Sequence, residues 1–195
     1  LAIIQASSGH ALSRERSNDE YRESLQEILD ATERAGASVS ALLEFARLEA
    51  GQAEPRKAPL RLDLLAEEVA AGVRVDGTVI EAAPGDAVVV DADDALLRQV
   101  LDNIVRNAAA RAGKVTLTTR FEGQTAVVDV IDDGPGFDPQ MLPHVFERFR
   151  RGDQSGTAGL GLAIARTIVE LHDGTCEASN NDDQGAKLSI RLPVR

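Results

Sequence analysis

Three polar side chains recur at a spacing of four residues: Asn103, Asn107 and Arg111. A helix expected over 93–112 carries them as one polar stripe beside an apolar face, because residues four apart lie on the same side of a helix. An amide oxygen is a suitable ligand for a hard cation such as Mg²⁺, and an arginine can bind phosphate. Taken without other motifs, the stripe is better explained as a solvated helix face.

A carboxylate and two glycines follow a strand expected over 125–131, in the order Asp132, Gly134 and Gly136. Glycines let the backbone approach a flat ligand closely. A carboxylate at the strand end can accept a hydrogen bond from an exocyclic amine such as that of adenine. A tight Asp-Gly turn is the better explanation when this motif is taken alone.

A second glycine cluster, residues 156–162, leads directly into a helix expected to end at residue 172. Glycines at a helix start expose backbone N–H groups and the positive end of the helix dipole, an arrangement that suits phosphate. The cluster follows a loop rather than a strand, which argues against a Rossmann fingerprint or a P-loop. It is weak evidence of function without the other motifs.

The segment between these motifs, residues 145–153, combines arginines with phenylalanines: Phe146, Arg148, Phe149, Arg150 and Arg151. This composition favours a lid whose basic side chains reach a phosphate while its rings pack on the domain. A surface helix with a small apolar face is the alternative interpretation.

The first 50 residues have the pattern of two helices, expected over 1–16 and from Asn18 onward. Ser17 and Glu20 form a capping-box pattern that starts the second helix. Apolar or small residues then recur at spacings of three and four: Leu25, Ile28, Leu29, Thr32, Ala35, Val39, Leu42, Leu43 and Ala46. Two helices cannot bury this stripe, so we expect an antiparallel hairpin that dimerises into a four-helix bundle. Packing of the hairpin on its own second domain is the alternative.

The pattern changes after Gly51, which ends the long helix, and Pro55 and Pro59 mark a short linker. Helices are then expected over 62–73, 93–112 and 157–172, and strands over 87–90, 114–121, 125–131, 175–178 and 187–192. The second domain is therefore predicted to be a layer of helices on a mixed sheet.

The composition limits the classes of function. The 195-residue chain has 21 basic and 32 acidic side chains and a formal net charge of −11, which argues against sequence-independent binding to nucleic acid. At 43% hydrophobic residues it can build a core. The single cysteine, Cys176, cannot form an internal disulfide, which fits a reducing compartment, and no apolar run is long enough to span a membrane.

The order of the motifs is more specific than any one of them. The asparagine helix, the sequence Asp-Asp-Gly-Pro-Gly, the phenylalanine-rich segment and the Gly-Leu-Gly-Leu helix resemble the catalytic ATP-binding domain of sensor histidine kinases. Residues 1–50 resemble the dimerisation and histidine-phosphotransfer domain of the same family. The resemblance implies an α+β fold in which a helical hairpin over 1–52, half of a dimeric four-helix bundle, precedes a linker over 53–60. A two-layer α/β sandwich of the histidine-kinase ATPase type is expected over 61–195.

The resemblance also implies roles for individual residues. Asn107 is expected to hold Mg²⁺ with support from Asn103, and Asp132 to bind the adenine amine in a pocket shaped by Gly134 and Gly136. The residues expected along the phosphates of ATP are Gly159, Leu160, Gly161, Leu162, Arg111, Arg148 and Arg151. Two residues depart from the family pattern. Thr157 replaces a usual glycine, and Ala186 replaces a threonine that often assists adenine binding.

No histidine of this sequence matches the family's phosphoacceptor segment, His-Glu-x-x-Thr-Pro. His10 lacks the following acid and the Thr-Pro pair, His144 lies beside the expected lid, and His172 ends a helix. The residues from Leu1 onward resemble those that follow the motif, so the chain is expected to begin just after it. Such a chain is expected to bind ATP and Mg²⁺ without phosphorylating itself, because phosphoryl transfer needs a positioned nucleophile.

For the intact protein, the resemblance implies phosphorylation of a histidine by ATP and transfer to an aspartate of a response-regulator receiver domain. It further implies a homodimer through residues 1–50 and a cytoplasmic location in a membrane-anchored sensor. Two alternatives stay open: a non-catalytic dimerisation or nucleotide-binding module, and an ATPase of the gyrase or chaperone type. Those hydrolases carry a glutamate as general base where this chain has Asn103, and an amide takes no proton at neutral pH, which favours a kinase.

Overall fold

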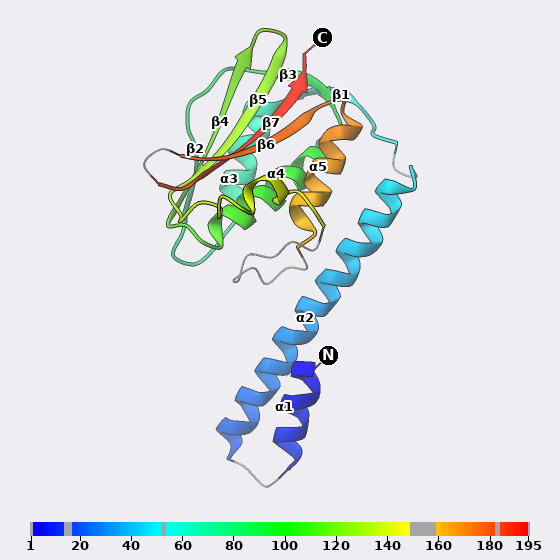
Figure 1. The fold of residues 1–195 in the computed structure, drawn as a ribbon, viewed down its shortest axis with the longest axis vertical. Coiled ribbons are helices and arrows are strands. Elements are labelled where there is room, and N and C mark those ends of the chain that lie inside the picture. Colours follow the sequence, from blue (N-terminus) through cyan, green and yellow to red (C-terminus); the bar gives the residue numbers. More distant parts are fainter. Residues whose placement is uncertain (1, 14–16, 52–53, 149–158, 182–183, 195) are drawn as a thin grey trace.

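The chain forms a pair of helices and an α/β unit that meet near the end of the longer helix (Figure 1). This structure, a computed structural model, describes residues 2–13, 17–51, 54–148, 159–181 and 184–194. In the part of the chain so described, no helix is both long and apolar enough to cross a membrane.

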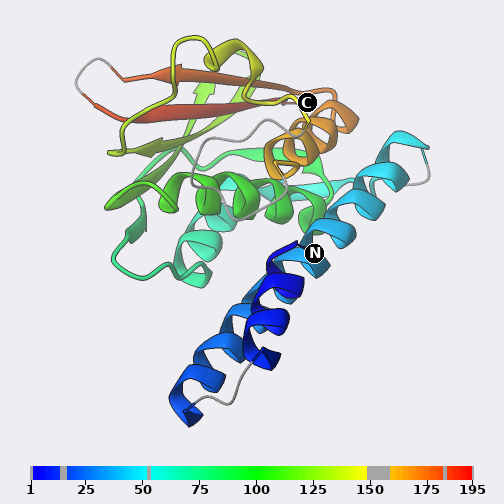
Figure 2. The same cartoon turned by 60° about the horizontal axis from the view of Figure 1, so that its bottom comes forward.

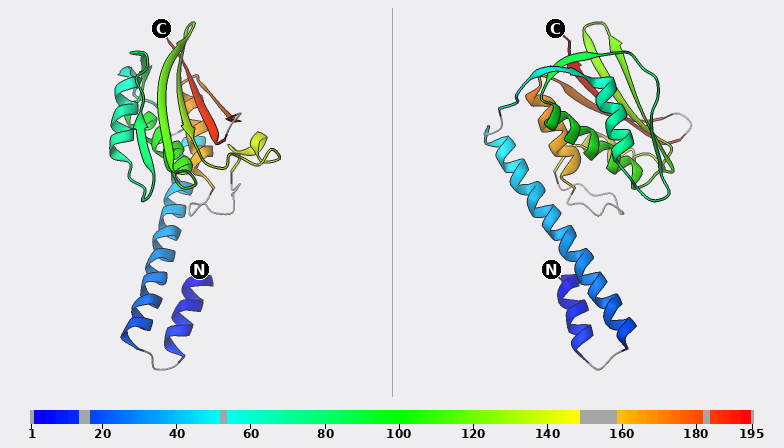
Figure 3. Two further views of the ribbon diagram at one scale, coloured as in Figure 1. Left: turned by 90° about the vertical axis from the view of Figure 1, so that its left-hand side faces the viewer. Right: turned by 180° about the vertical axis from the view of Figure 1, so that it is seen from behind.

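The helix pair consists of α1 (Ala2–Leu12) and the 32-residue α2 (Asn18–Glu49), which run antiparallel (Figures 1 and 3). The predicted capping box is confirmed at the start of α2. Ser17 Oγ accepts a hydrogen bond from the Glu20 N–H at 3.2 Å, and the Glu20 carboxylate accepts one from the Ser17 N–H at 2.8 Å. Helix α1 ends at Leu12, earlier than the predicted residue 16, and residues 14–16 lie outside the described residues.

Helix α1 leaves most of the apolar stripe of α2 uncovered. Five side chains of the stripe are between 47% and 63% exposed: Leu25, Leu29, Val39, Leu42 and Leu43. Near its C-terminal end, α2 instead presents Phe45 and Leu48 to the α/β unit, where both join the core at 6% and 5% exposure. The end of the long helix thus packs on the second domain of its own chain, whereas the stripe does not.

A five-stranded mixed sheet forms one layer of the α/β unit (Figures 1 and 2). Its strand order is β2-β4-β5-β7-β6, with β2 parallel to β4 and all other neighbours antiparallel. The strand bounds are β2 (Val79–Ala82), β4 (Lys114–Glu122), β5 (Thr125–Asp132), β6 (Thr175–Asn180) and β7 (Ala186–Pro193). A separate antiparallel pair is formed by β1 (Ala58–Arg61) and β3 (Val89–Ala92).

Three helices form the second layer and cover one face of the sheet (Figure 3). They are α3 (Leu62–Gly72), α4 (Asp94–Ala109) and α5 (Gly161–Leu171). Aliphatic side chains fill the space between the layers, as the low aromatic content requires, and include Val100 and Ile104 of α4 and Ile168 of α5. The predicted α+β fold, a helical hairpin followed by a two-layer sandwich, is confirmed.

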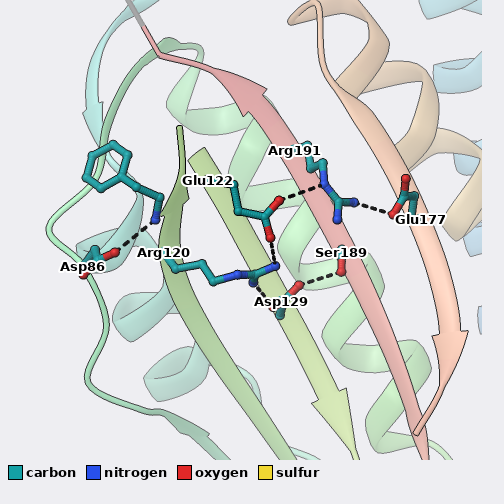
Figure 4. A network of polar contacts seen from close by, with 8 residues as sticks. Asp86, Arg120, Glu122, Asp129, Glu177, Ser189 and Arg191 are labelled. Atoms are coloured by element: carbon teal, nitrogen blue, oxygen red, sulfur yellow. Dashed lines mark hydrogen bonds and ion pairs between the residues drawn. The ribbon is translucent and has the colours of Figure 1, made fainter. Parts of the chain in front are cut away.

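Alternation along β5 decides which polar residues face the helices. Val128, Val130 and Asp132 lie on the helix-covered side of the sheet, because side chains two apart share a face. Asp129 therefore lies on the opposite face, in a polar network across four strands (Figure 4). Its carboxylate accepts a hydrogen bond from Ser189 Oγ at 2.6 Å and pairs with Arg120.

That network continues along the outer face of the sheet. Arg120 also pairs with Glu122 at 2.6 Å, and Arg191 joins Glu122 to Glu177 of the edge strand β6. The outer face is thus covered by its own charged side chains, which leaves the helix-covered side as the place for a site that uses Asp132.

Several short elements differ from the sequence-based expectation. Strands β1 and β2 and the short 3₁₀ helix η1 (Leu142–His144) were not predicted, and β1 overlaps the predicted linker. Four-residue strands carry little periodicity, and their partners are remote: Ala58 pairs with Ala92, and Val79 with Lys114. Strand β3 lies two residues beyond the predicted strand at 87–90. Helix α5 begins at Gly161 rather than at residue 157, which lies outside the described residues.

Candidate functional site

Asn103 and Asn107 of the predicted polar stripe lie on α4, but Arg111 lies in the turn after it, because the helix ends at Ala109 rather than at the predicted residue 112. Asn103 and Asn107 are half-buried, and the Nδ2 atom of each is buried without a hydrogen-bond partner among the described residues. A buried polar group without a partner costs about 1–3 kcal/mol. Two such amides one helical turn apart are therefore suited to a polar ligand, and the solvated-face interpretation of the stripe does not fit their burial.

Asp132 ends β5 as a buried carboxylate, 8% exposed. Its Oδ1 accepts hydrogen bonds from the Gly134 N–H at 2.9 Å and from the Ala186 N–H at 3.2 Å. These bonds fix the orientation of the carboxylate, and Oδ2 makes no hydrogen bond with a described residue. Ala186, which stands where the family often has threonine, thus supports Asp132 through its backbone.

The glycines of this region allow close packing of backbone on backbone. Gly185 has φ +96°, and a Cβ added there would lie 1.8 Å from the carbonyl oxygen of Asp132. Gly136 has φ +76°, and its Cβ would lie 2.9 Å from Asn180 Oδ1. Both positions therefore require glycine. The atoms that would clash with a side chain belong to Asp132 and Asn180 of the same chain.

The loop after β5 is tied on one side to the turn between α4 and β4. Asp133 Oδ1 accepts hydrogen bonds from the N–H groups of Gly113 and Lys114, both at 2.9 Å. The guanidinium carbon of Arg111 lies 5.0 Å from the centroid of the Phe137 ring, in a cation–π contact. Arg111 forms no ion pair with a carboxylate of the described residues.

The β6–β7 hairpin holds the same loop on its other side. Asn180 Oδ1 accepts a hydrogen bond from the Phe137 N–H, and Asn180 Nδ2 donates one to the Phe137 carbonyl oxygen, both at 2.8 Å. Gln184 Nε2 donates to the Asp133 carbonyl oxygen at 3.1 Å. The loop that follows Asp132 is thus fixed between the α4–β4 turn and this hairpin.

Helix α5 brings its N-terminus to the asparagines of α4. A Cβ added to Gly161 would lie 3.6 Å from Asn103 Oδ1, so the two predicted motifs meet there. Leu160 is the N-cap residue, is buried at 1% exposure and provides no side-chain cap, and the first turn contains no acidic residue. Backbone N–H groups at such a helix start favour an anion. Gly159, with φ +69°, and Leu162 flank this start.

Arg148 lies apart from these residues and contacts the long helix. Its guanidinium carbon lies 4.3 Å from the centroid of the Phe45 ring, and it pairs with Glu49, both residues of α2. Among the described contacts, none joins Arg148 to the residues around Asn107. Arg151 and Thr157, also named from the sequence, lie outside the described residues.

A buried histidine links the outer ends of α4 and α5. His172 Nδ1 donates to the Ile168 carbonyl oxygen at 2.8 Å, which leaves Nε2 to accept a hydrogen bond from the Asp93 N–H at 3.0 Å. The Asp93 side chain in turn caps α4 by accepting from the Leu96 N–H at 3.2 Å. Although burial favours its protonated form, the N–H groups of Arg56 and Leu96 hold the pKa of Asp93 below its ordinary value. Through His172, these hydrogen bonds connect the start of α4 to the end of α5.

Sequence reasoning missed Asn180 and Gln184, and it missed the hydrogen bonds that Asp133 accepts from Gly113 and Lys114. Asn180 and Phe137 are 43 residues apart, and only the pairing of β6 with β7 brings them together. An Asn-Asn pair at a strand end was a visible turn signal, but no spacing connected it to the glycine loop.

The comparisons with known proteins agree with this geometry. A family model described as "Histidine kinase-, DNA gyrase B-, and HSP90-like ATPase" matches residues 92–195. That span contains both site helices and the glycine loop between them. The chain belongs to this ATPase family.

The relatives that match this chain include probable sensor histidine kinases. The chain is 35% identical over 181 residues to the probable sensor histidine kinase TcrY of Mycobacterium tuberculosis, which covers 87% of this chain and 38% of that protein. The chain spans between 38% and 50% of the first three curated relatives it matches.

Solved structures show the same fold. The histidine kinase AdeS of Acinetobacter baumannii superposes with a TM-score of 0.75 at 20% identity, covering 100% of this chain and 94% of that chain. The mycobacterial sensor histidine kinase MprB gives 0.63 at 28% identity, covering 71% of this chain and 98% of that chain. The α/β unit is therefore an ATP-binding catalytic domain of the type found in sensor histidine kinases.

Proposed function

We propose that this chain binds ATP with Mg²⁺ and serves as the kinase core of a two-component sensor histidine kinase. The observation that carries the proposal is the pair of buried, unpartnered amides at Asn103 and Asn107 beside the uncapped start of α5. Together they offer polar groups for a cation and a set of backbone donors for phosphate oxygens.

The residues of α4 fit a Mg²⁺ ion that is held partly by the nucleotide. No cluster of three or more His, Cys, Asp or Glu able to hold a metal occurs in the described ranges, so an all-protein cage is not available there. Mg²⁺ characteristically keeps waters and substrate phosphates as ligands and takes few from the protein. An asparagine amide exchanges its nitrogen for its oxygen by a half-turn, so Asn107 would hold Mg²⁺ through Oδ1 with Asn103 beside it.

Other residues would bind the remaining parts of the nucleotide. Asp132 would accept a hydrogen bond from the adenine amine through Oδ2, because its Oδ1 is already occupied by two backbone N–H groups. Residues 159–162 would lie along the phosphates, and Arg111 would offset their charge in a chain that is acidic as a whole. Arg148 would reach the phosphates only after leaving Phe45 and Glu49.

The phosphoryl acceptor would be a histidine outside the present sequence, followed by an aspartate of a response-regulator receiver domain. His10 is exposed on the last turn of α1 and has none of the flanking residues of the phosphoacceptor motif. His144 Nδ1 contacts Glu147 at 2.6 Å, and both ring nitrogens of His172 are bonded within the core. We therefore expect ATP binding without autophosphorylation of these 195 residues.

The remaining proposals concern assembly. Residues 1–52 would be a dimerisation unit, residues 53–60 a linker and residues 61–195 the catalytic domain. The exposed apolar stripe of α2 supports a homodimer through residues 1–50. That the intact protein is a membrane-anchored sensor with this part in the cytoplasm is proposed from the family resemblance alone.

Nucleotide binding is tested by titrating the chain with a non-hydrolysable ATP analogue, with and without Mg²⁺, by isothermal titration calorimetry. We expect Mg²⁺-dependent binding by the wild-type chain and a loss of that dependence in Asn107→Ala. Arg98→Gln is the matched control, because Arg98 lies on the same helix as Asn107 and only an exposed ion pair with Glu68 of α3 is removed. It should bind as the wild type does. Absence of binding by the wild-type chain would refute the proposal, and unchanged Mg²⁺ dependence in Asn107→Ala would refute the ligand assignment.

Incubation with radiolabelled ATP tests the expected lack of autophosphorylation.

A further inference from the structure

We infer that Asn180 is a positioning residue of the nucleotide site, which acts through Phe137 to hold the guanidinium of Arg111 for the phosphates of ATP. The inference rests on the proposed nucleotide-binding function. It adds a residue from β6, at the far edge of the sheet, to the motifs of the α4 and α5 region.

The first link joins Asn180 to the backbone of Phe137. The Asn180 amide donates to the carbonyl oxygen and accepts from the N–H of the same residue, both at 2.8 Å. A side chain that bonds both backbone groups of one residue fixes its φ and ψ, in the way that a neighbouring strand would. Gly136, at φ +76°, lets the loop pass close enough to Asn180 for both bonds to form.

The second link joins the Phe137 ring to Arg111. The ring lies 5.0 Å from the guanidinium carbon, and Phe137 is half-buried against the core. A ring face attracts a cation without donating a counter-charge. The five N–H donors of a guanidinium then stay directed at other acceptors, whereas a carboxylate partner would engage them.

The charge balance of the protein makes this arrangement informative. The chain carries 32 acidic side chains against 21 basic ones, and arginines such as Arg98, Arg120 and Arg191 are paired with carboxylates. Arg111 is half-buried and lacks such a carboxylate partner among the described residues, although Asp132 and Asp133 are close in the fold. An arginine held on a ring in these surroundings is suited to a ligand anion.

Competition binding with a fluorescent ATP analogue tests the inference on the 195-residue chain. Mg²⁺ with a non-hydrolysable ATP analogue serves as one competitor, and adenosine, which lacks phosphates, as the other. The variants are Asn180→Ala and Asn180→Asp, the second of which keeps the acceptor but sets an oxygen against the Phe137 carbonyl. Glu177→Gln, which lies on the same strand and alters an exposed ion pair with Arg191, is the control.

We expect both Asn180 substitutions to lower the affinity of the chain for the non-hydrolysable ATP analogue by about fivefold, which is the equivalent of a lost cation–π contact. Adenosine affinity should stay within about twofold of the wild type, since Arg111 serves the phosphates only. In an Arg111→Ala background, Asn180→Ala should produce no further loss. Wild-type affinity for the ATP analogue in both Asn180 variants would overturn the inference.

A purely structural role would give a different result. It would lower the affinity for adenosine and for the ATP analogue equally, and would do so in the Arg111→Ala background as well, which would also overturn the inference. Failure of the wild-type chain to bind the analogue at all would instead reject the proposed function, and the inference with it.

Discussion

The guanidinium carbon of Arg148 lies 4.3 Å from the centroid of the Phe45 ring of α2. The same guanidinium forms an ion pair with Glu49, one turn further along α2. Phe45 is itself buried, at 6% exposure, where α2 meets the α/β unit. Arg148, in the segment that the sequence predicts to be a lid, thus contacts α2 rather than the predicted nucleotide site.

Arg148 is predicted to contact either α2 or the nucleotide, so that its contacts with α2 compete with nucleotide binding. The double variant Phe45→Leu with Glu49→Gln removes both contacts with little change in core volume, so it should raise affinity for the Mg²⁺-bound ATP analogue by about threefold. Calorimetric titration measures the change. The same double variant in an Arg148→Ala background is the control and should show no increase. Equal or lower affinity in the double variant would contradict the prediction.

The Gly185→Ala variant is predicted to disrupt the loop around Asp132. Its Cβ would lie 1.8 Å from the Asp132 carbonyl oxygen at a φ of +96°, so the free energy of unfolding should fall by about 3 kcal/mol or more. Gly123→Ala is the matched control: φ is +65° and nothing lies within 4 Å of the added Cβ, so the cost is about 1–2 kcal/mol. Urea unfolding compares the two, and equal losses would show that the contact with Asp132 does not matter.

Asp93 is predicted to contribute stability that is lost in acid. Backbone N–H groups hold its folded pKa below the ordinary value of 3.8 despite burial. The ionised side chain therefore stabilises the fold above pH 3.8, and this contribution disappears as the pH falls through the lower folded pKa. Asp93→Asn keeps a capping group that does not titrate. The stability advantage of the wild type over this variant, measured by urea unfolding, should shrink below pH 3.8, and a constant difference would exclude the mechanism.

The exposed stripe of α2 is predicted to form the dimer interface. Leu29 is 51% exposed in the isolated chain, and Leu29→Asp would place a charge in an apolar interface, so it should convert a dimer into monomers without unfolding the α/β unit. Leu64→Asp, at a position 46% exposed on α3, is the control and should leave the mass unchanged. Sedimentation equilibrium measures both, and a monomeric wild type or a dimeric Leu29→Asp would contradict the prediction.

Local chemistry made much of the site predictable. The spacing of Asn103 and Asn107 specifies one helix face wherever that helix packs, and the Ser17–Glu20 capping box needs only four consecutive residues. The strand predicted over 125–131 likewise placed Asp132 at a strand end. These patterns are short in sequence, so each could be recognised without knowledge of the fold.

The tertiary structure decided which of these residues meet and which do not. It placed Gly161 against Asn103 and Asn180 against Phe137, and it moved Arg148 to Phe45 on α2. Each of these contacts joins residues far apart in sequence, and strand pairing or helix packing sets the distance between them. Residue types and spacings therefore determined the chemistry available to this protein. Long-range packing determined which groups act together, because no local pattern encodes the approach of one backbone segment to another.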